Sequence, residues 1–249
     1  MQIAGRDLLG SGVLPLAQLA VAGTLGLSAA GAFQIATRIL GLIDALTLAP
    51  LRFTALPRLR SVSPTTLAPA LAGQLRLTAT VSAWVWGGTL AALPEIARFA
   101  AGDQHGAAVA PVVAALAGFG LSGAMTMPVN QAVLAQGGTR LMLDRALAVC
   151  GLSALLLPFG LAVGVTGAAV ALSLAALLAS LWHLSRALPI LGLSRGDLAP
   201  VVPPLGAGSA MTLALIPLAG LPFMAKVVIG TTIYAALLAL CRPAPRVPA

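Results

Sequence analysis

The chain has 249 residues, 59% of them hydrophobic and only 8% charged, and its mean hydropathy is +1.01. This composition excludes a water-soluble domain and indicates an integral membrane protein, in which a helix needs about 20 apolar residues to cross the bilayer. The net charge of +8 could suggest a nucleic acid partner. The basic residues stand at the ends of apolar runs, however, so membrane orientation accounts for them and we expect no nucleic acid.

The apolar residues follow one another in continuous runs, which predicts helices rather than the alternating strands of a membrane barrel. Pro111 and Pro128 interrupt one long run, where we expect a kink or an interfacial end. The charged connection Pro94–Gly106 is expected as an external loop. The predicted fold class is all-α integral membrane, with about eight transmembrane helices at residues 8–26, 31–50, 71–93, 107–136, 141–163, 166–187, 201–219 and 222–240.

Basic residues fall on alternate connections between these runs. With the N-terminus in the cytoplasm, Arg98 and Lys226 lie outside and Arg38 lies within a span. Cytoplasmic connections carry the excess of Lys and Arg in membrane proteins, so the pattern predicts an inner (plasma) membrane protein with both termini cytoplasmic. The remaining basic residues, all on the cytoplasmic side, are Arg6, Arg52, Arg58, Arg60, Arg76, Arg140, Arg145, Arg186, Arg195, Arg242 and Arg246.

Three polar residues of the second run are candidates for a substrate cavity. A charge inside a span costs on the order of 3 kcal/mol and needs a partner or a wet cavity. Arg38 lies eight residues into this run and shares a helical face with Gln34, one turn earlier. The two can meet an anionic group, or Arg38 can be structural and pair within the bundle. Asp44 lies on another face, and a structural pairing with Arg52 or Arg76 is favoured for it.

Two amides of the fourth run complete the candidate set. Asn130 and Gln131 follow Pro128, which loosens a helix by removing a backbone donor. The amides can line a cavity or tie neighbouring helices together, and the sequence favours neither. Cys150 and Cys241 are expected as buried free thiols. The sequence shows no cluster of residues suited to catalysis or to a metal, and we expect no cofactor.

The stretch of residues 24–59 resembles a helical hairpin of the bacterial polysaccharide (Wzx-like) flippases, in the multidrug/oligosaccharidyl-lipid/polysaccharide exporter superfamily. The turns L-A-Q-G at 134–137 and G-V-T-G-A-A at 164–169 are similar to later turns of that family. The motifs are loose, and their order and topology carry the resemblance over residues 8–240. Within the hairpin, the matching positions are Gly26, Gly31, Ala36, Arg38, Pro50 and Pro57.

Members of this family have two lobes of six helices that enclose the substrate. The resemblance implies that residues 1–188 form the C-terminal lobe and residues 189–249 two additional transmembrane helices with a short cytoplasmic tail. The first lobe is missing, so a partial chain or a separate partner chain is expected. The implied partners are membrane lipid and an undecaprenyl-diphosphate-linked oligosaccharide, flipped by alternating access. Flipping requires no bond chemistry, so a transporter rather than an enzyme is expected.

Two other functions stay open. A multidrug or organic-cation antiporter of the same superfamily would need carboxylates in its cavity, where Asp44 is the only intramembrane acid away from the helix ends. A non-transporting scaffold subunit of a glycan-assembly complex would explain the missing lobe and the sparse polar interior.

Overall fold

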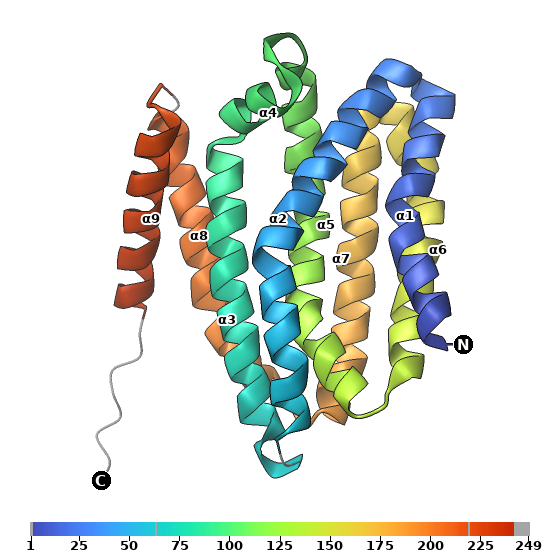
Figure 1. Ribbon diagram of the computed structural model, residues 1–249, viewed down its shortest axis with the longest axis vertical. Helices are drawn as coiled ribbons and strands as arrows, with labels where there is room; N and C mark the ends of the chain where they lie inside the picture. The colour runs from blue at the N-terminus through green and yellow to red at the C-terminus, as the bar shows by residue number, and fades with distance from the viewer. Residues whose placement is uncertain (1, 63, 219, 242–249) are drawn as a thin grey trace.

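The computed structural model describes residues 2–62, 64–218 and 220–241, and these residues are helical apart from short turns (Figure 1). The predicted all-α fold is confirmed. Six helices are long and apolar enough to cross a membrane, and α1 adds the shorter apolar segment Gly12–Leu25. The helices are α1 (Gln2–Leu25), α2 (Leu27–Arg60), α3 (Pro64–Ala91), α4 (Leu93–Ala101), α5 (Asp103–Ala135), α6 (Thr139–Val163), α7 (Val165–Ile190), η1 (Arg195–Val201), α8 (Val202–Leu215), η2 (Ile216–Leu218) and α9 (Phe223–Leu240).

The helix α2 continues well beyond its predicted end at residue 50 and passes through both Pro50 and Pro57. Each proline removes one backbone donor, and packing of the later turns offsets that loss. Leu59, near the end of α2, is buried in an apolar cluster with Leu67 and Leu71 of α3. The extension is therefore held by neighbouring helices rather than by its own propensity.

The region Pro94–Gly106 is not the expected loop. Residues 93–101 form α4, with Pro94 in its first turn, and α5 begins at Asp103. Proline is well placed there because the first helical N–H groups have no intrahelical partner. The helix α5 then runs without a break through Pro111 and Pro128.

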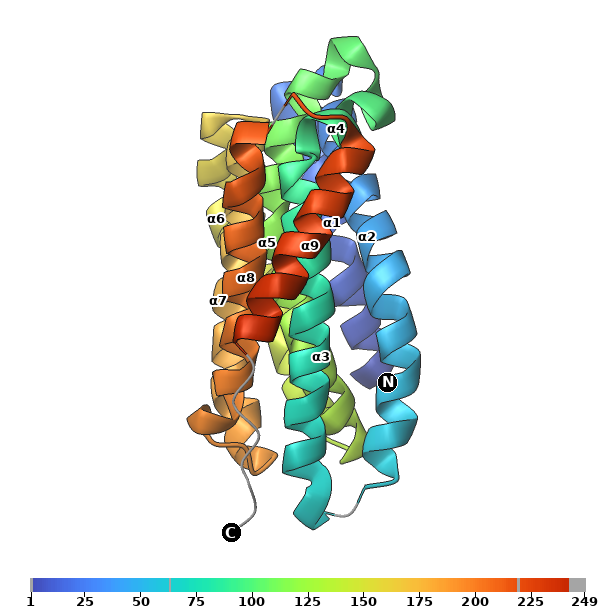
Figure 2. The same ribbon diagram turned by 90° about the vertical axis from the view of Figure 1, so that its left-hand side faces the viewer.

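The long helices pack side by side, and α5 lies between α2, α3 and α7 (Figures 1 and 2). The helices α8 and α9 flank α3 on one side, and α6 lies on the other side against α1 and α7. The short helix α4 caps the end at which α1 meets α2, and we call this the α4 end. The opposite end carries the ends of α2 and α7 and the beginnings of α3 and α6.

Glycines allow two of the closest helix contacts. A Cβ on Gly120 of α5 would overlap Trp86 of α3 and come within 2.8 Å of Leu40 of α2. A Cβ on Gly208 of α8 would lie 2.7 Å from the Ala83 carbonyl oxygen of α3. Small residues of this kind let membrane helices approach closely.

The helices α8 and α9 share an apolar cluster with α3 that includes Ala83, Met211 and Tyr234. The Tyr234 hydroxyl donates to the Thr80 carbonyl of α3 at 2.7 Å. The division of the chain at residue 188 stays a prediction. Arg242 and Arg246 lie outside the described residues, and the side chains of Arg6 and Arg195 are not described.

Candidate functional site

Gln34 and Arg38 lie one turn apart on α2, and both are exposed. The Arg38 guanidinium makes no hydrogen bond or ion pair with another residue in the described part of the chain. A guanidinium carries five donors in a rigid fork and suits carboxylate or phosphate acceptors. The structure therefore presents a cation, with an amide beside it, on the outer face of the bundle.

The same face of α2 continues with large apolar side chains. Leu42, Leu46 and Phe53 are 63%, 77% and 80% exposed. Together with Gln34 and Arg38 they form one broad strip, which we call the α2 stripe. Its polar part lies toward the α4 end of the bundle and its apolar part toward the opposite end, since α2 begins where α1 ends.

Asp44 faces a different direction and lines a hollow of about 480 Å³ between α1, α2, α3 and α5. An Asp44 Oδ2 to Arg52 Nη2 distance of 3.7 Å joins the two side chains. Arg52 was one of the two partners that the sequence suggested for Asp44. Both side chains are about half exposed, so the pair neutralises charge but adds little stability.

Asn130 and Gln131 lie near the far end of α5 and are partly buried. The Asn130 Oδ1 is buried without a hydrogen-bond partner in the described part of the structure. Because α2 and α5 both run away from the α4 end, these amides lie deeper along the bundle than Gln34 and Arg38. The five predicted residues thus occupy three places and do not form one cluster.

Sequence reasoning missed a row of buried polar side chains on α3. Gln74, Thr78 and Ser82 recur every four residues, and each has a buried side-chain atom with no hydrogen bond to the described residues. Trp86, one turn further along α3, packs on Gly120 of α5. The row lies on the same face of α3 as Trp86 and therefore faces α5. Buried polar groups usually bond protein or water, so the row marks a polar seam inside the lobe. Its four-residue spacing was the available signal.

A second missed feature joins α9 to α4. The Lys226 ammonium is only 2% exposed and donates to Glu95 Oε1 at 2.5 Å. Burial raises the pKa of the Glu95 carboxyl, but the hydrogen bond and positive charge of Lys226, with Arg98 nearby, lower that pKa below its ordinary value. The pair is an anchor between helices at the α4 end.

No family model matches the chain, and no curated protein matches its sequence. Among solved structures, the chain is similar to "Lipid II flippase MurJ, inward closed conformation", with a TM-score of 0.76 and 14% identity. The match covers 94% of this chain and 51% of the flippase, so the chain spans about half the length of that protein. At this identity the likeness concerns the fold: the chain is built like one lobe of a two-lobed flippase.

Proposed function

We propose that the chain is one half of a transmembrane flippase that moves a lipid-linked oligosaccharide for polysaccharide or lipopolysaccharide biosynthesis. The substrate would be carried on undecaprenyl diphosphate and would enter a cavity between this lobe and a second one. The fold likeness to a lipid II flippase supports the class of transporter. The polysaccharide substrate rests on the sequence resemblance. Flipping needs no bond chemistry, so the proposed activity is transport.

The observation that carries the proposal is the exposed, unpartnered Arg38 on the α2 stripe. A guanidinium facing hydrocarbon would cost on the order of 3 kcal/mol, so the stripe is better suited to a wet cavity between lobes. A diphosphate offers the paired oxygens that a guanidinium binds most tightly. In this proposal Gln34 binds beside Arg38. Asp44, Asn130 and Gln131 lie elsewhere in the lobe and are assigned no direct contact with the diphosphate.

The proposed orientation places the α4 end outside the cell and the opposite end in the cytoplasm of a bacterial inner membrane. Arg58 and Arg60 end α2, Arg140 begins α6 and Arg186 lies in the last turns of α7, all at the end opposite α4. This excess of positive charge suits the cytoplasmic side, and both termini would lie there.

The antiporter alternative is less well supported. A site for organic cations needs an unneutralised carboxylate, whereas Asp44 is paired with Arg52. Arg38 on the α2 stripe is then a positive charge that no described carboxylate neutralises, which favours an anionic substrate. The scaffold alternative gains no specific support from an exposed cation without a partner.

The test uses the lobe together with its second half, in cells that depend on glycan export. We expect Arg38→Gln to lower export by about tenfold or more, because a charge-assisted contact contributes roughly 1.5–3 kcal/mol. Lipid-linked precursor would then accumulate in the inner leaflet. Arg58→Gln, an exposed arginine at the end of the same helix, is the matched control and should export normally.

Drug efflux provides the opposing measurement in the same strains. Asp44→Asn should reduce neither drug resistance nor the stability of the purified protein by a large amount. Loss of drug resistance in Asp44→Asn, with glycan export intact in Arg38→Gln, would instead support the antiporter.

A further inference from the structure

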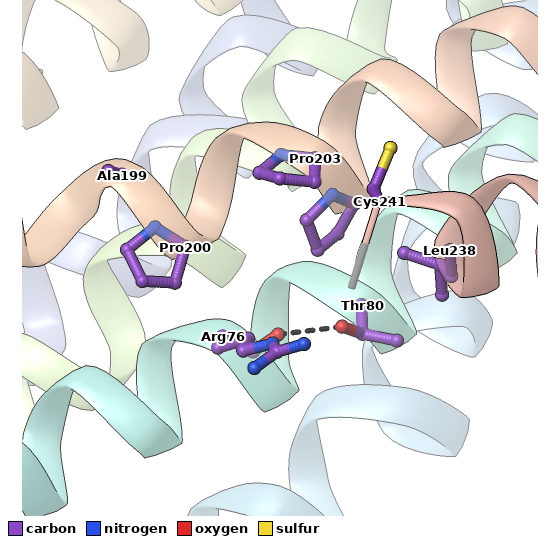
Figure 3. A pocket seen from close by; sticks show the side chains of 8 residues that line it. Arg76, Thr80, Ala199, Pro200, Pro203, Leu238 and Cys241 are labelled. Carbon is purple, nitrogen blue, oxygen red and sulfur yellow. Dashed lines mark hydrogen bonds between the residues drawn. The ribbon is translucent and has the colours of Figure 1, made fainter. Parts of the chain in front are cut away.

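A second hollow lies on the other flank of the bundle, away from the α2 stripe. It has a volume of about 420 Å³ and is enclosed by α3, by the junction of η1 with α8, and by the end of α9 (Figure 3). Arg76 and Thr80 of α3 form one side, Pro200 and Pro203 a second, and Leu238 of α9 a third, as Figure 3 shows. Ala199, Pro204 and Cys241 complete the lining.

Arg76 is the one charged residue among those that line this hollow, and it is exposed. Its guanidinium makes no hydrogen bond or ion pair with any residue that the structure describes. The Thr80 hydroxyl donates to the Arg76 carbonyl at 2.8 Å, so that proton is already used within α3. The site is thus a cationic donor fork beside a wall of proline and aliphatic side chains.

The ends of the helices fix the depth of this hollow in the membrane. The helix α9 has 18 residues and is therefore about 27 Å long, close to the thickness of the hydrocarbon layer. It ends at Leu240, and the next residue, Cys241, lines the hollow. The hollow therefore lies where hydrocarbon meets lipid headgroups, on the side of the membrane toward the basic end of the bundle, and α2 and α3 continue past it toward that end (Figure 1).

We propose that this hollow binds the headgroup phosphate of an anionic phospholipid from the cytoplasmic leaflet. Arg76 donates its guanidinium fork to the phosphate oxygens, and the prolines and Leu238 contact the glycerol and the first methylenes of the acyl chains. Basic pockets between helices on the cytoplasmic side suit such headgroups. The apolar wall favours a lipid over a free anion. The proposal uses the proposed orientation and none of the residues assigned to transport.

The experiment measures lipid binding to the purified chain in neutral detergent, by native mass spectrometry with added phosphatidylglycerol. Arg76→Gln should weaken the apparent Kd on the order of tenfold, and Arg76→Lys should weaken it less, because it keeps charge but loses the fork. Leu238→Trp, which fills the hollow and leaves Arg76 in place, should also weaken binding. Arg58→Gln is the control and should bind as the wild type does.

Three ligands separate the sources of phosphate. Phosphatidylcholine, which has no net charge, should bind at least tenfold more weakly than phosphatidylglycerol, and inorganic phosphate should not compete at millimolar concentration. Equal binding by wild type and Arg76→Gln would overturn the proposal. So would full competition by inorganic phosphate, or displacement of phosphatidylglycerol by an equimolar amount of undecaprenyl phosphate, which would assign the hollow to a free ion or to the transported lipid.

Discussion

Lys226 and Glu95 join two helices whose contacting residues are 131 positions apart in the chain. The two partners differ in burial, since Lys226 is 2% exposed and the Glu95 side chain 20% exposed. Removing one member of a buried pair leaves the other charge uncompensated, and that penalty grows with burial. The two single substitutions should therefore have unequal effects.

We expect Glu95→Gln to destabilise the fold by about 3 kcal/mol and Lys226→Met by about 2 kcal/mol, because the stranded ammonium has less access to water than the stranded carboxylate. The double variant should lose less than the sum of the two. Thermal or denaturant unfolding in detergent measures the stability of the wild type, the two single variants and the double variant, which together form a double-mutant cycle. Additive losses would show that the two side chains are not coupled.

The same pair predicts a pH dependence. Burial raises the pKa of Glu95, but Lys226 lowers it by more than burial raises it. The pKa of Glu95 therefore lies below its ordinary value of 4.5. The folded-state pKa is thus lower than that of the unfolded chain, so the stabilisation is complete above about pH 4.5 and is lost as the pH falls through the folded-state pKa. The stability advantage of wild type over Glu95→Gln should shrink on acidification. Asp103→Asn, an exposed acid at the same end, is the control; an advantage independent of pH would contradict the assignment.

At the scale of the elements, α3 and α8 approach each other through glycine. A Cβ on Gly208 would meet the Ala83 carbonyl oxygen and Ala83 Cβ, and neither can move without shifting α3. We expect Gly208→Val to push α8 away from α3 and to carry α9 with it. The cost is about 1–3 kcal/mol, as for other overpacked contacts.

A chemical cross-link reports this movement. The Trp84 indole of α3 donates to Thr231 of α9 at 3.2 Å and spans the gap between the two helices. Once Cys150 and Cys241 are replaced, a short bifunctional thiol reagent can therefore join Trp84→Cys to Thr231→Cys. Gly208→Val should lower the cross-linking yield severalfold. Gly206→Val is the matched control, because nothing lies within 4 Å of a Cβ there. Equal yields in both variants would show that α8 tolerates the added side chain.

The long helices were predictable because each is a continuous apolar run. The helix α4 was not, since its nine residues include Glu95 and Arg98 and therefore resemble a charged loop. The Asp44–Arg52 pair was also within reach, because both residues stand on one helix and nearly on one face. The Lys226–Glu95 pair depends on packing between distant helices, and no spacing in the sequence indicates it.

At the scale of the whole molecule, the charge asymmetry predicts the orientation of the bundle. Ser28 lies in the first turn of α2 at the α4 end, and Ser61 caps the other end of the same helix. In a cysteine-free background, Ser28→Cys should react with an impermeant maleimide in intact spheroplasts. Ser61→Cys should react only after the membrane is opened. The reverse pattern would invert the proposed topology and place the Arg76 hollow in the outer leaflet.

The α2 stripe is an exposed face with both apolar and charged side chains, so neither water nor lipid alone suits it. Its side chains Leu46 and Phe53 are as exposed as those of a lipid-facing surface, but the stripe also carries Arg38 and Gln34. Lipid would suit the apolar half and penalise the charged half. A second lobe suits both, because it buries the leucines and encloses the arginine in a polar cavity.

A photo-reactive side chain in place of Leu46 distinguishes protein from lipid on this surface. We expect it to cross-link to a protein partner, either the second lobe or another chain, when the transporter is irradiated in native membranes. Phe159 of α6, 70% exposed on the other side of the bundle, is the matched control and should react with lipid. Lipid adducts alone at Leu46 would mean that α2 faces the bilayer. Arg38 would then need a partner in the membrane interface, and the cavity between two lobes would have to be sought on another face.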